Sequence, residues 1–164
     1  MIKVPGSKSI TNRALVLASL ASGTSRLKNA LVSDDTRVMR HALEQCGIRT
    51  TGTTNVVVHG GRLHASKKTL KCGNSGTTVR FLTALLSSQP FETTIDGDAR
   101  MRQRPIQGLS AALTKLGARI ESINNSACPP LKIRGPLDGG RCTIDGSVSS
   151  QFLSGLLMAA PKAK

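Results

Sequence analysis

Apolar residues recur at helical spacing directly after three turns that are rich in glycine and serine. The three stretches read GSKSITNRALVLASLA from Gly6, GNSGTTVRFLTALL from Gly73 and GSVSSQFLSGLLMAA from Gly146. They begin 67 and 73 residues apart, and Gly47 recurs 70 residues later as Gly117. A fixed period of this length predicts a repeated structural unit, in which each copy buries its apolar face against its neighbours.

Each copy predicts the order helix, strand, helix, strand, strand. The first helix is expected to end near Gly23, and a second is expected to run from the N-cap Ser33 to a glycine stop at Gly47. In the second copy Pro105 is expected at the first helical position and Gly117 at the stop. Runs of β-branched and apolar residues predict strands at Val56–Val58, Thr69–Cys72, Thr93–Ile95, Leu131–Ile133 and Cys142–Ile144.

The expected architecture is therefore an α/β fold of about two and a half units within one domain. Unit one covers about residues 3–72 and opens with the strand-like pair Lys3-Val4, unit two covers about 73–145, and unit three begins at 146–164. The third copy reaches Pro161 after its first helix, and Met1 stands just before the first strand-like pair. Because a repeat of this kind needs its neighbours to bury its apolar face, we interpret the sequence as part of a longer protein.

Charge narrows the partners that we expect. The chain has 23 Lys and Arg against 9 Asp and Glu, a net charge of +14, which favours an anionic partner. The basic residues are dispersed, and Tyr and Trp are absent, so a surface for stacking nucleic-acid bases is not expected. No apolar run reaches transmembrane length, so no membrane partner is expected either.

The cysteines and the N-terminus bear on the compartment. The four cysteines form no CxxC pair and have no accompanying histidine spacing, so we expect reduced thiols and no metal site. No signal or transit peptide is visible. These observations favour a cytoplasmic protein, or a plastid protein if the source is a plant.

The starts of the three repeated helices carry the candidate chemistry. A helix N-terminus presents free backbone N–H groups and the positive end of its dipole, and therefore favours anions. Lys8 and Arg13 lie on the first turns of the first helix, and Gly76 is expected to let a ligand approach the second. Arg100 to Arg104 concentrates three arginines, whose planar guanidinium groups suit phosphate and carboxylate. We expect these groups to form one pocket for phosphates and carboxylates.

Plainer interpretations stay open for the same residues. An exposed helix start accounts for Lys8 and Arg13, and a basic loop accounts for the three arginines. Helix capping is the simpler explanation of Asp34 and Asp35. Capping alone would explain one, but not all four, of the polar residues at the third helix start, which are Ser147, Ser149, Ser150 and Gln151.

Five blocks in a fixed order resemble the enolpyruvyl transferase family, and within it the 5-enolpyruvylshikimate-3-phosphate (EPSP) synthases. The blocks are PGSKSITNRA, SDDT, GNSGTTVRFL, DARMRQRPI and DGSVSSQFLSGLLMAAP, and the resemblance extends from Lys3 to Pro161. One departure is Phe81, which follows Arg80 where that family often has proline. The related UDP-N-acetylglucosamine enolpyruvyl transferases usually have a reactive cysteine in a PGC-type loop, and no such block is visible here.

The resemblance implies an inside-out α/β barrel built of repeated βαβαββ units, three in each of two similar domains. The implied reaction transfers the enolpyruvyl group of phosphoenolpyruvate to shikimate 3-phosphate, giving EPSP and phosphate in aromatic amino-acid biosynthesis. No metal or organic cofactor is implied. The missing second domain, or a complementary fragment, would supply the acidic proton-transfer residue, so this chain is expected to bind ligand without turning it over.

The resemblance also implies roles for individual residues. Lys8 is the implied catalytic residue and contacts both substrates. The residues implied to hold shikimate 3-phosphate are Lys8, Ser9, Arg13, Ser149, Ser150 and Gln151. Those implied to hold phosphoenolpyruvate are Lys8, Gly76, Arg104 and Gln151, with Asn74, Thr77 and Arg100 in support. Two other classes stay open: a half-enzyme that only binds ligand or a partner fragment, and an RNA-binding protein similar to RNA 3′-phosphate cyclases.

Overall fold

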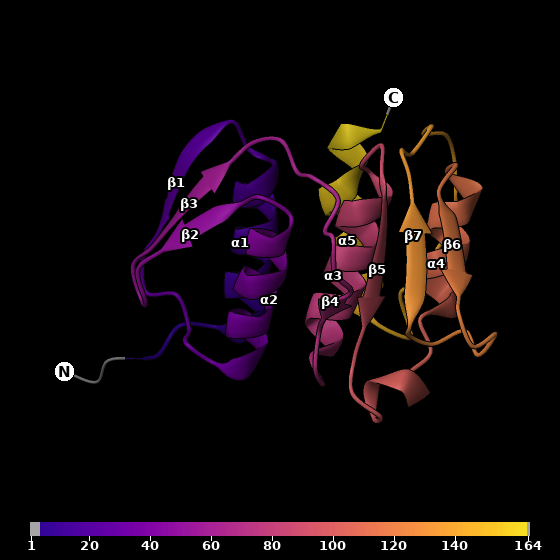
Figure 1. Ribbon diagram of the computed structural model, residues 1–164, viewed down its shortest axis with the longest axis horizontal. Helices are drawn as coiled ribbons and strands as arrows, with labels where there is room; N and C mark the ends of the chain where they lie inside the picture. The colour runs from indigo at the N-terminus through magenta and orange to yellow at the C-terminus, as the bar shows by residue number, and fades with distance from the viewer. Residues whose placement is uncertain (1–3, 164) are drawn as a thin grey trace.

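The computed structural model describes residues 4–163, so Lys3, the expected start of unit one, lies outside the described residues. Two sheets lie on the outside of a group of helices (Figure 1). In chain order the elements are α1 (Lys8–Leu20), β1 (Gly23–Leu27), α2 (Asp34–Gln45), β2 (Arg49–Thr51), β3 (Val56–Gly60), β4 (Leu70–Lys71), α3 (Gly76–Ser87), β5 (Glu92–Asp96), the 3-10 turn η1 (Met101–Gln103), α4 (Gln107–Lys115), β6 (Arg119–Ser122), β7 (Leu131–Arg134), α5 (Ser150–Ala159) and the 3-10 turn η2 (Ala160–Lys162).

The strand order of the first sheet recurs in the second. The first sheet has the order β1-β3-β2, and the second has the order β4-β5-β7-β6. β1 and β2 both pair antiparallel to β3, just as β5 and β6 both pair antiparallel to β7. β4 adds a parallel strand beside β5, with Leu70 opposite Ile95. From β4 to β7 the chain therefore has the order βαβαββ, which agrees with the repeat read from the sequence.

Helix α3 occupies the centre of the molecule. Ten of its twelve residues are buried, and it packs against α1, α2, α4 and α5 as well as β5 and β7. Two of its buried hydroxyl groups are satisfied within the helix, because Thr83 Oγ1 donates to the Val79 carbonyl at 2.8 Å and Ser87 Oγ donates to the Thr83 carbonyl at 2.7 Å. The hydroxyls of Thr77 and Thr78 have partners outside the helix. A helix with polar residues can therefore lie in the core without unpaired hydroxyls.

In both units a glycine lets the end of a strand pack directly against the end of a helix. A Cβ atom on Gly60, at the end of β3, would collide with the carbonyl oxygens of Ala18 and Ala21 at the end of α1. A Cβ atom on Gly135, just after β7, would collide with the Ser87 carbonyl oxygen at the end of α3. Only glycine allows this close approach of strand and helix backbone.

The predicted helix limits of the first unit are confirmed. Ser33 caps α2, its side chain accepting from the Thr36 N–H while Thr36 Oγ1 accepts from the Ser33 N–H. Gly47 and Gly117 follow α2 and α4 with φ of +91° and +105°, the left-handed conformation expected of a glycine stop.

Three details of the sequence interpretation differ from the structure. Pro105 is not the first residue of α4, which begins two residues later at Gln107 without a side-chain cap. The prediction of a strand at Cys142–Ile144 is wrong. Its counterpart one repeat earlier is β4, which pairs with β5, the strand that follows α3. Among residues 4–163 no strand follows α5, so Cys142–Ile144 has no equivalent strand to pair with. Strands β1, β2 and β6 were not located in the sequence, because polar residues occupy most of their positions.

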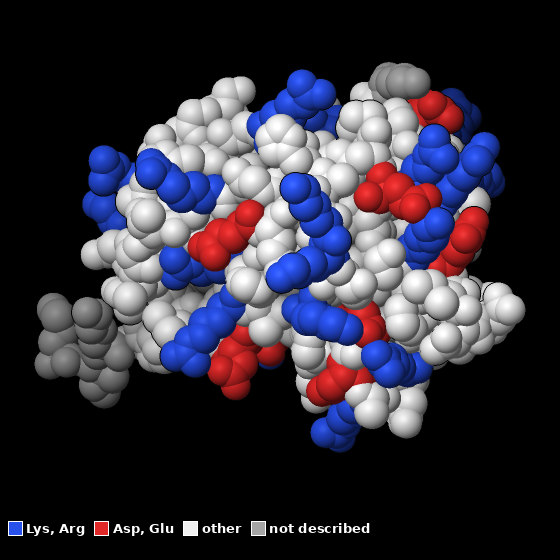
Figure 2. All heavy atoms as spheres, in the orientation of Figure 1, with Lys and Arg blue, Asp and Glu red and all other residues white. Residues whose placement is uncertain are grey.

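The helices and charges show how the surface is organised. Within the described residues, no helix is long and apolar enough to span a membrane. On the face shown in Figure 2, Lys and Arg side chains lie in separate groups, several of them beside Asp or Glu. This face has no continuous basic track of the kind that follows a nucleic-acid backbone.

Candidate functional site

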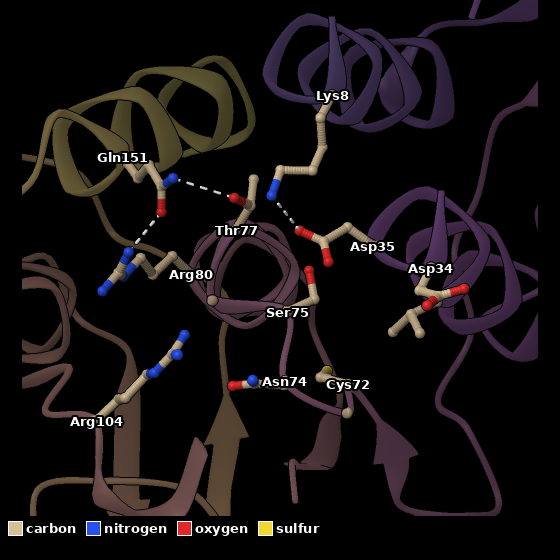
Figure 3. A pocket seen from close by; sticks show the side chains of 13 residues that line it. Lys8, Asp34, Asp35, Cys72, Asn74, Ser75, Thr77, Arg80, Arg104 and Gln151 are labelled. Atoms are coloured by element: carbon tan, nitrogen blue, oxygen red, sulfur yellow. Dashed lines mark hydrogen bonds and ion pairs between the residues drawn. The ribbon is translucent and has the colours of Figure 1, made fainter. Parts of the chain in front are cut away.

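Four helix N-termini surround a cavity of about 640 Å³. The first turns of α1, α2, α3 and α5 meet there, together with the turn before α3 and the segment after η1 (Figure 3). The lining residues are Lys8, Asp34, Asp35, Val38, Cys72, Gly73, Asn74, Ser75, Gly76, Thr77, Arg80, Arg104 and Gln151. Three helix starts were expected to converge, and α2 adds a fourth.

The turn Asn74–Ser75–Gly76 places the start of α3 at the edge of the cavity. Ser75 caps the helix by accepting from the Thr78 N–H at 3.3 Å, and its hydroxyl lies 2.8 Å from Thr78 Oγ1. A Cβ atom on Gly76 would lie 3.5 Å from Nη1 of Arg104 and 3.6 Å from Nη1 of Arg80. Because glycine has no side chain there, the first turn of α3 and both guanidinium groups face the same space.

Lys8 reaches into this cavity from the first residue of α1. Its Nζ atom lies 3.0 Å from Oδ2 of Asp35, on the first turn of α2 (Figure 3). The two side chains are 49% and 25% exposed, so the ion pair remains in contact with solvent. Asp35 was expected only to favour the helix start, and its contact with Lys8 could not be read from the spacing of the two residues.

Arg80, Thr77 and Gln151 join α3 to α5 on the opposite side of the cavity. Arg80 Nη1 donates to Gln151 Oε1 at 2.6 Å, and Gln151 Nε2 donates to Thr77 Oγ1 at 3.1 Å. Burial, and after it the positive charge of Arg104, lowers the pKa of Arg80. Two cations of the same site therefore repel each other, an arrangement that an anion between them would relieve.

A second group of predicted residues lies beside the cavity without lining it. Arg13 donates to the Ser9 carbonyl at 3.1 Å and to Ser154 Oγ at 2.9 Å, and Ser154 in turn donates to the Ser150 carbonyl at 2.9 Å. The Arg13 guanidinium also lies over the ring of Phe81, 5.1 Å from its centroid. The first turns of α1 and α5 are thus held together through an arginine.

The two remaining predicted residues take different positions. Ser149 caps α5 and accepts from the Gln151 N–H at 3.2 Å. Arg100 is exposed in the loop before η1 and does not line the cavity. The structure therefore places Lys8 and five other predicted residues on the cavity wall, and it leaves Ser9, Arg13, Ser149, Ser150 and Arg100 outside the lining. The other five on the wall are Asn74, Gly76, Thr77, Arg104 and Gln151.

A family model described as EPSP synthase (3-phosphoshikimate 1-carboxyvinyltransferase) matches residues 1–164. The chain belongs to the EPSP synthase family. A 3-phosphoshikimate 1-carboxyvinyltransferase of Pseudomonas savastanoi pv. phaseolicola is 48% identical over 168 residues, covering 99% of this chain and 40% of the relative. One from Rhizobium etli is 49% identical over 161 residues, covering 95% of this chain and 38% of the relative.

Solved structures agree with this assignment. EPSP synthase from Acinetobacter baumannii superposes with a TM-score of 0.92 at 31% identity, over 99% of this chain and 38% of that one. The enolpyruvyl transferase NikO from Streptomyces tendae shares the fold, with a TM-score of 0.65 at 17% identity. This chain thus spans about 40% of the length of the EPSP synthases that it matches.

Cys72 is the one cysteine on the wall of this EPSP synthase-family site. Burial, and to a smaller extent the Asp96 carboxylate, raises its pKa to about 12. The thiol is therefore protonated at neutral pH and poorly suited to act as a nucleophile. Among the described residues, no group of three or more His, Cys, Asp and Glu side chains is placed to hold a metal ion.

Proposed function

We propose that this chain holds shikimate 3-phosphate and phosphoenolpyruvate for enolpyruvyl transfer. The observation that carries the proposal is the convergence of four helix N-termini with Lys8, Arg80 and Arg104 around one cavity. Both substrates are anions that carry a phosphate and a carboxylate. Backbone N–H groups, ammonium and guanidinium are the partners that such ligands bind best.

The proposed residue roles follow the two groups of side chains. Gly76 and Arg104, with Gln151, would hold phosphoenolpyruvate at the start of α3, supported by Asn74 and Thr77. Arg13 and the start of α5 would hold shikimate 3-phosphate, through Ser9, Ser149, Ser150 and Gln151. Lys8 lies at the start of α1, and Arg13 links this helix to α5. The ammonium group of Lys8 reaches into the cavity. Lys8 can therefore contact both substrates. Arg100 would act from the loop as a supporting cation.

In the proposed reaction, a substrate hydroxyl adds to the double bond of phosphoenolpyruvate and inorganic phosphate then leaves. Negative charge accumulates on the departing phosphate, and cations already held in place stabilise it without reorganisation. Lys8 is the group best placed for this, because it is half exposed and only has to leave Asp35 to meet a substrate anion. Binding of the substrates would exchange Asp35 for a substrate anion as the partner of Lys8.

We further propose that residues 1–164 are part of one domain of a two-domain enzyme, in about two and a half βαβαββ units of an inside-out barrel. The proposal is supported by the relatives, of which this chain covers about 40%. A complementary domain would supply the acid for proton transfer, since the two carboxylates that line the cavity, Asp35 and Asp34, are engaged by Lys8 and Arg37. The four free cysteines favour a reducing compartment such as the cytoplasm or a plastid.

Ligand protection tests the binding part of the proposal. Shikimate 3-phosphate should raise the thermal unfolding midpoint of the chain in a saturable way. Arg13→Ala should weaken that protection, whereas Arg119→Ala should not, because Arg119 is an exposed residue of β6 far from the cavity lining. Equal effects of the two variants would mean that shikimate 3-phosphate is attracted by net charge alone. Protection by UDP-N-acetylglucosamine, or steeply salt-dependent RNA binding, would favour the two alternative functions instead.

Complementation tests the catalytic part. The chain alone should release no phosphate from the two substrates. Mixing it with the remaining portion of a related EPSP synthase should restore phosphate release, because domain closure excludes water and completes the catalytic groups. Lys8→Ala should abolish the restored activity. Turnover by the isolated chain that is lost on Lys8→Ala would contradict the proposed need for a second domain.

A further inference from the structure

A buried carboxylate lies behind the cavity wall at the end of β5. Asp96 is 3% exposed and accepts four hydrogen bonds. Arg102 donates to it twice, from Nε at 3.0 Å and Nη2 at 2.7 Å. Lys71 Nζ donates at 2.9 Å and the Gly97 N–H at 2.8 Å. A carboxylate that accepts this many bonds, two of them from one guanidinium, is fixed in position.

These four bonds join the two segments that reach the phosphoenolpyruvate side of the cavity. Lys71 ends β4 and is followed by the turn of Asn74 and Gly76. Arg102 lies in η1, two residues before Arg104. The backbone strengthens the same junction, because the Cys72 N–H donates to the Asp96 carbonyl at 2.7 Å.

Glycine contacts tighten the junction further. The Asp98 N–H donates to the Gly73 carbonyl at 3.0 Å, and the Met101 N–H donates to Asp98 Oδ1 at 2.9 Å. A Cβ atom on Gly97 would collide with the Met101 side chain and would lie 2.7 Å from the Gly73 carbonyl oxygen. The loop 97–104 and the turn 72–75 therefore meet backbone to backbone, with Asp96 beneath them.

Arg104 needs such an anchor because it shares the cavity with a second cation, Arg80. Its guanidinium and that of Arg80 approach the same point above Gly76, and Arg104 contributes to the lowered pKa of Arg80. Within residues 4–163, no carboxylate lies within ion-pairing distance of Arg104. Before an anion binds, repulsion therefore favours movement of Arg104 away from the cavity.

We propose that Asp96 is a positioning residue, which holds the loop 97–104 through Arg102 and so keeps Arg104 opposite Gly76 for anion binding. The sequence analysis counted Arg102 among the three arginines expected to form the pocket, whereas the family resemblance implied no role for Asp96 or Arg102. The identity of the anion rests on the proposed function, whereas the position of Arg104 does not. The test therefore measures the two separately.

Asp96→Asn is the first variant, and Glu92→Gln is its matched control. Glu92 lies at the other end of β5 and pairs with Lys132 at 3.0 Å, away from the cavity lining. Inorganic phosphate is the probe for binding. Asp96→Asn should raise the phosphate dissociation constant roughly tenfold, by analogy with the effect of removing a hydrogen-bond partner that orients a metal ligand. Glu92→Gln should leave it unchanged.

Two further measurements distinguish positioning from general stability. In an Arg104→Ala background, Asp96→Asn should have no further effect on phosphate binding, because the group that it positions is absent. Without any ligand, the rate at which phenylglyoxal modifies Arg104, followed by mass spectrometry, should rise in Asp96→Asn and stay constant in Glu92→Gln. If Asp96→Asn does not fold, Arg102→Gln removes the same link from an exposed side chain and should give the same results.

An unchanged Arg104 modification rate in both Asp96→Asn and Arg102→Gln would overturn the proposal. So would an undiminished effect of Asp96→Asn on phosphate affinity in the Arg104→Ala background. If the unmodified chain binds no phosphate at all, the proposed function loses its support, and the phenylglyoxal rates still decide whether Asp96 positions Arg104.

Discussion

The sheets of the two units have the same strand order, but the units differ in the segment that leads into their second helix. Three strands have the same relative order in both, β1-β3-β2 and β5-β7-β6, and in the second sheet β4 adds a strand outside β5. In unit one the short link after β1 ends at Ser33, which caps α2 with a reciprocal pair of hydrogen bonds. In unit two the link after β5 contains η1 and three arginines, and α4 begins without a side-chain cap. The scaffold is repeated, whereas the charged loop belongs to one copy only.

The first helices of the two units differ as well. Six of the thirteen residues of α1 are buried, against ten of the twelve in α3. Helix α3 lies between the neighbouring helices and its own sheet, so its first turn is surrounded by the starts of other helices. Unit two therefore contributes the centre of the core and seven of the thirteen residues that line the cavity. Unit three contributes Gln151, and unit one contributes Lys8, Asp34, Asp35, Val38 and Cys72.

The largest loss of stability should come from disrupting the close contact between strand and helix that both units have at a glycine. Gly60→Ala and Gly135→Ala should each lower the free energy of unfolding by about 3 kcal/mol, because the added methyl group meets backbone carbonyl oxygens that cannot move independently. Chemical denaturation measures both. Gly146→Ala is the control, since a Cβ atom there meets nothing within 4 Å. A large loss at only one of the two sites would show that the units are not built alike.

The next effect is confined to unit two and depends on pH. Hydrogen bonds from Arg102 and then Lys71, against the opposing effect of burial, lower the pKa of Asp96 from 3.8 to about 2. A lowered pKa stabilises the fold above pH 4, and the contribution is lost as the pH falls toward 2. Asp96→Asn should therefore cost on the order of 2 kcal/mol at neutral pH and progressively less below pH 4. A difference in unfolding free energy that stays constant across this range would contradict the assignment.

A smaller loss of stability should distinguish α2, the second helix of unit one, from α4, the second helix of unit two. Ser33→Ala should cost about 1 kcal/mol, because it leaves the Thr36 N–H of α2 without its cap. Ser110→Ala, on the exposed side of α4, should be close to neutral because that helix has no side-chain cap to lose. Thermal unfolding of the two variants provides the measurement, and equal losses would mean that the cap of α2 is not special.

The smallest effect concerns thiol reactivity and leaves stability unchanged. Burial raises the pKa of Cys46 to about 11, and burial together with Asp96 raises that of Cys72 to about 12. Cys142 is only partly buried. At pH 8, iodoacetamide should modify Cys142 first and the other two only on the timescale of unfolding. Rapid modification of Cys72 in the folded protein would show that the cavity wall opens.

Features that depend on local spacing could be predicted from the sequence. The first turns of the repeated helices and the stops at Gly47 and Gly117 depend on residues within a few positions of one another, and the 70-residue period is the recurrence of these local patterns. The strand expected at Cys142–Ile144 failed because a short strand needs a partner, and its own sequence does not supply one. Phe81 continues α3 without interruption, because it keeps the backbone N–H that a proline would lack, and its ring is buried in the core against Arg13.

The sequence by itself determined the repeat, the family blocks and the set of cations that face anions at helix starts. Only the tertiary structure decided which of these meet. Lys8 pairs with Asp35, and Arg13 donates a hydrogen bond to Ser154, 141 positions later in the sequence. Asp96 forms ion pairs with both Lys71 and Arg102. The physical reason is that helix periodicity is set by neighbours along the chain. A contact between elements depends instead on how packed helices and strands are rotated and shifted against one another, which no single segment specifies.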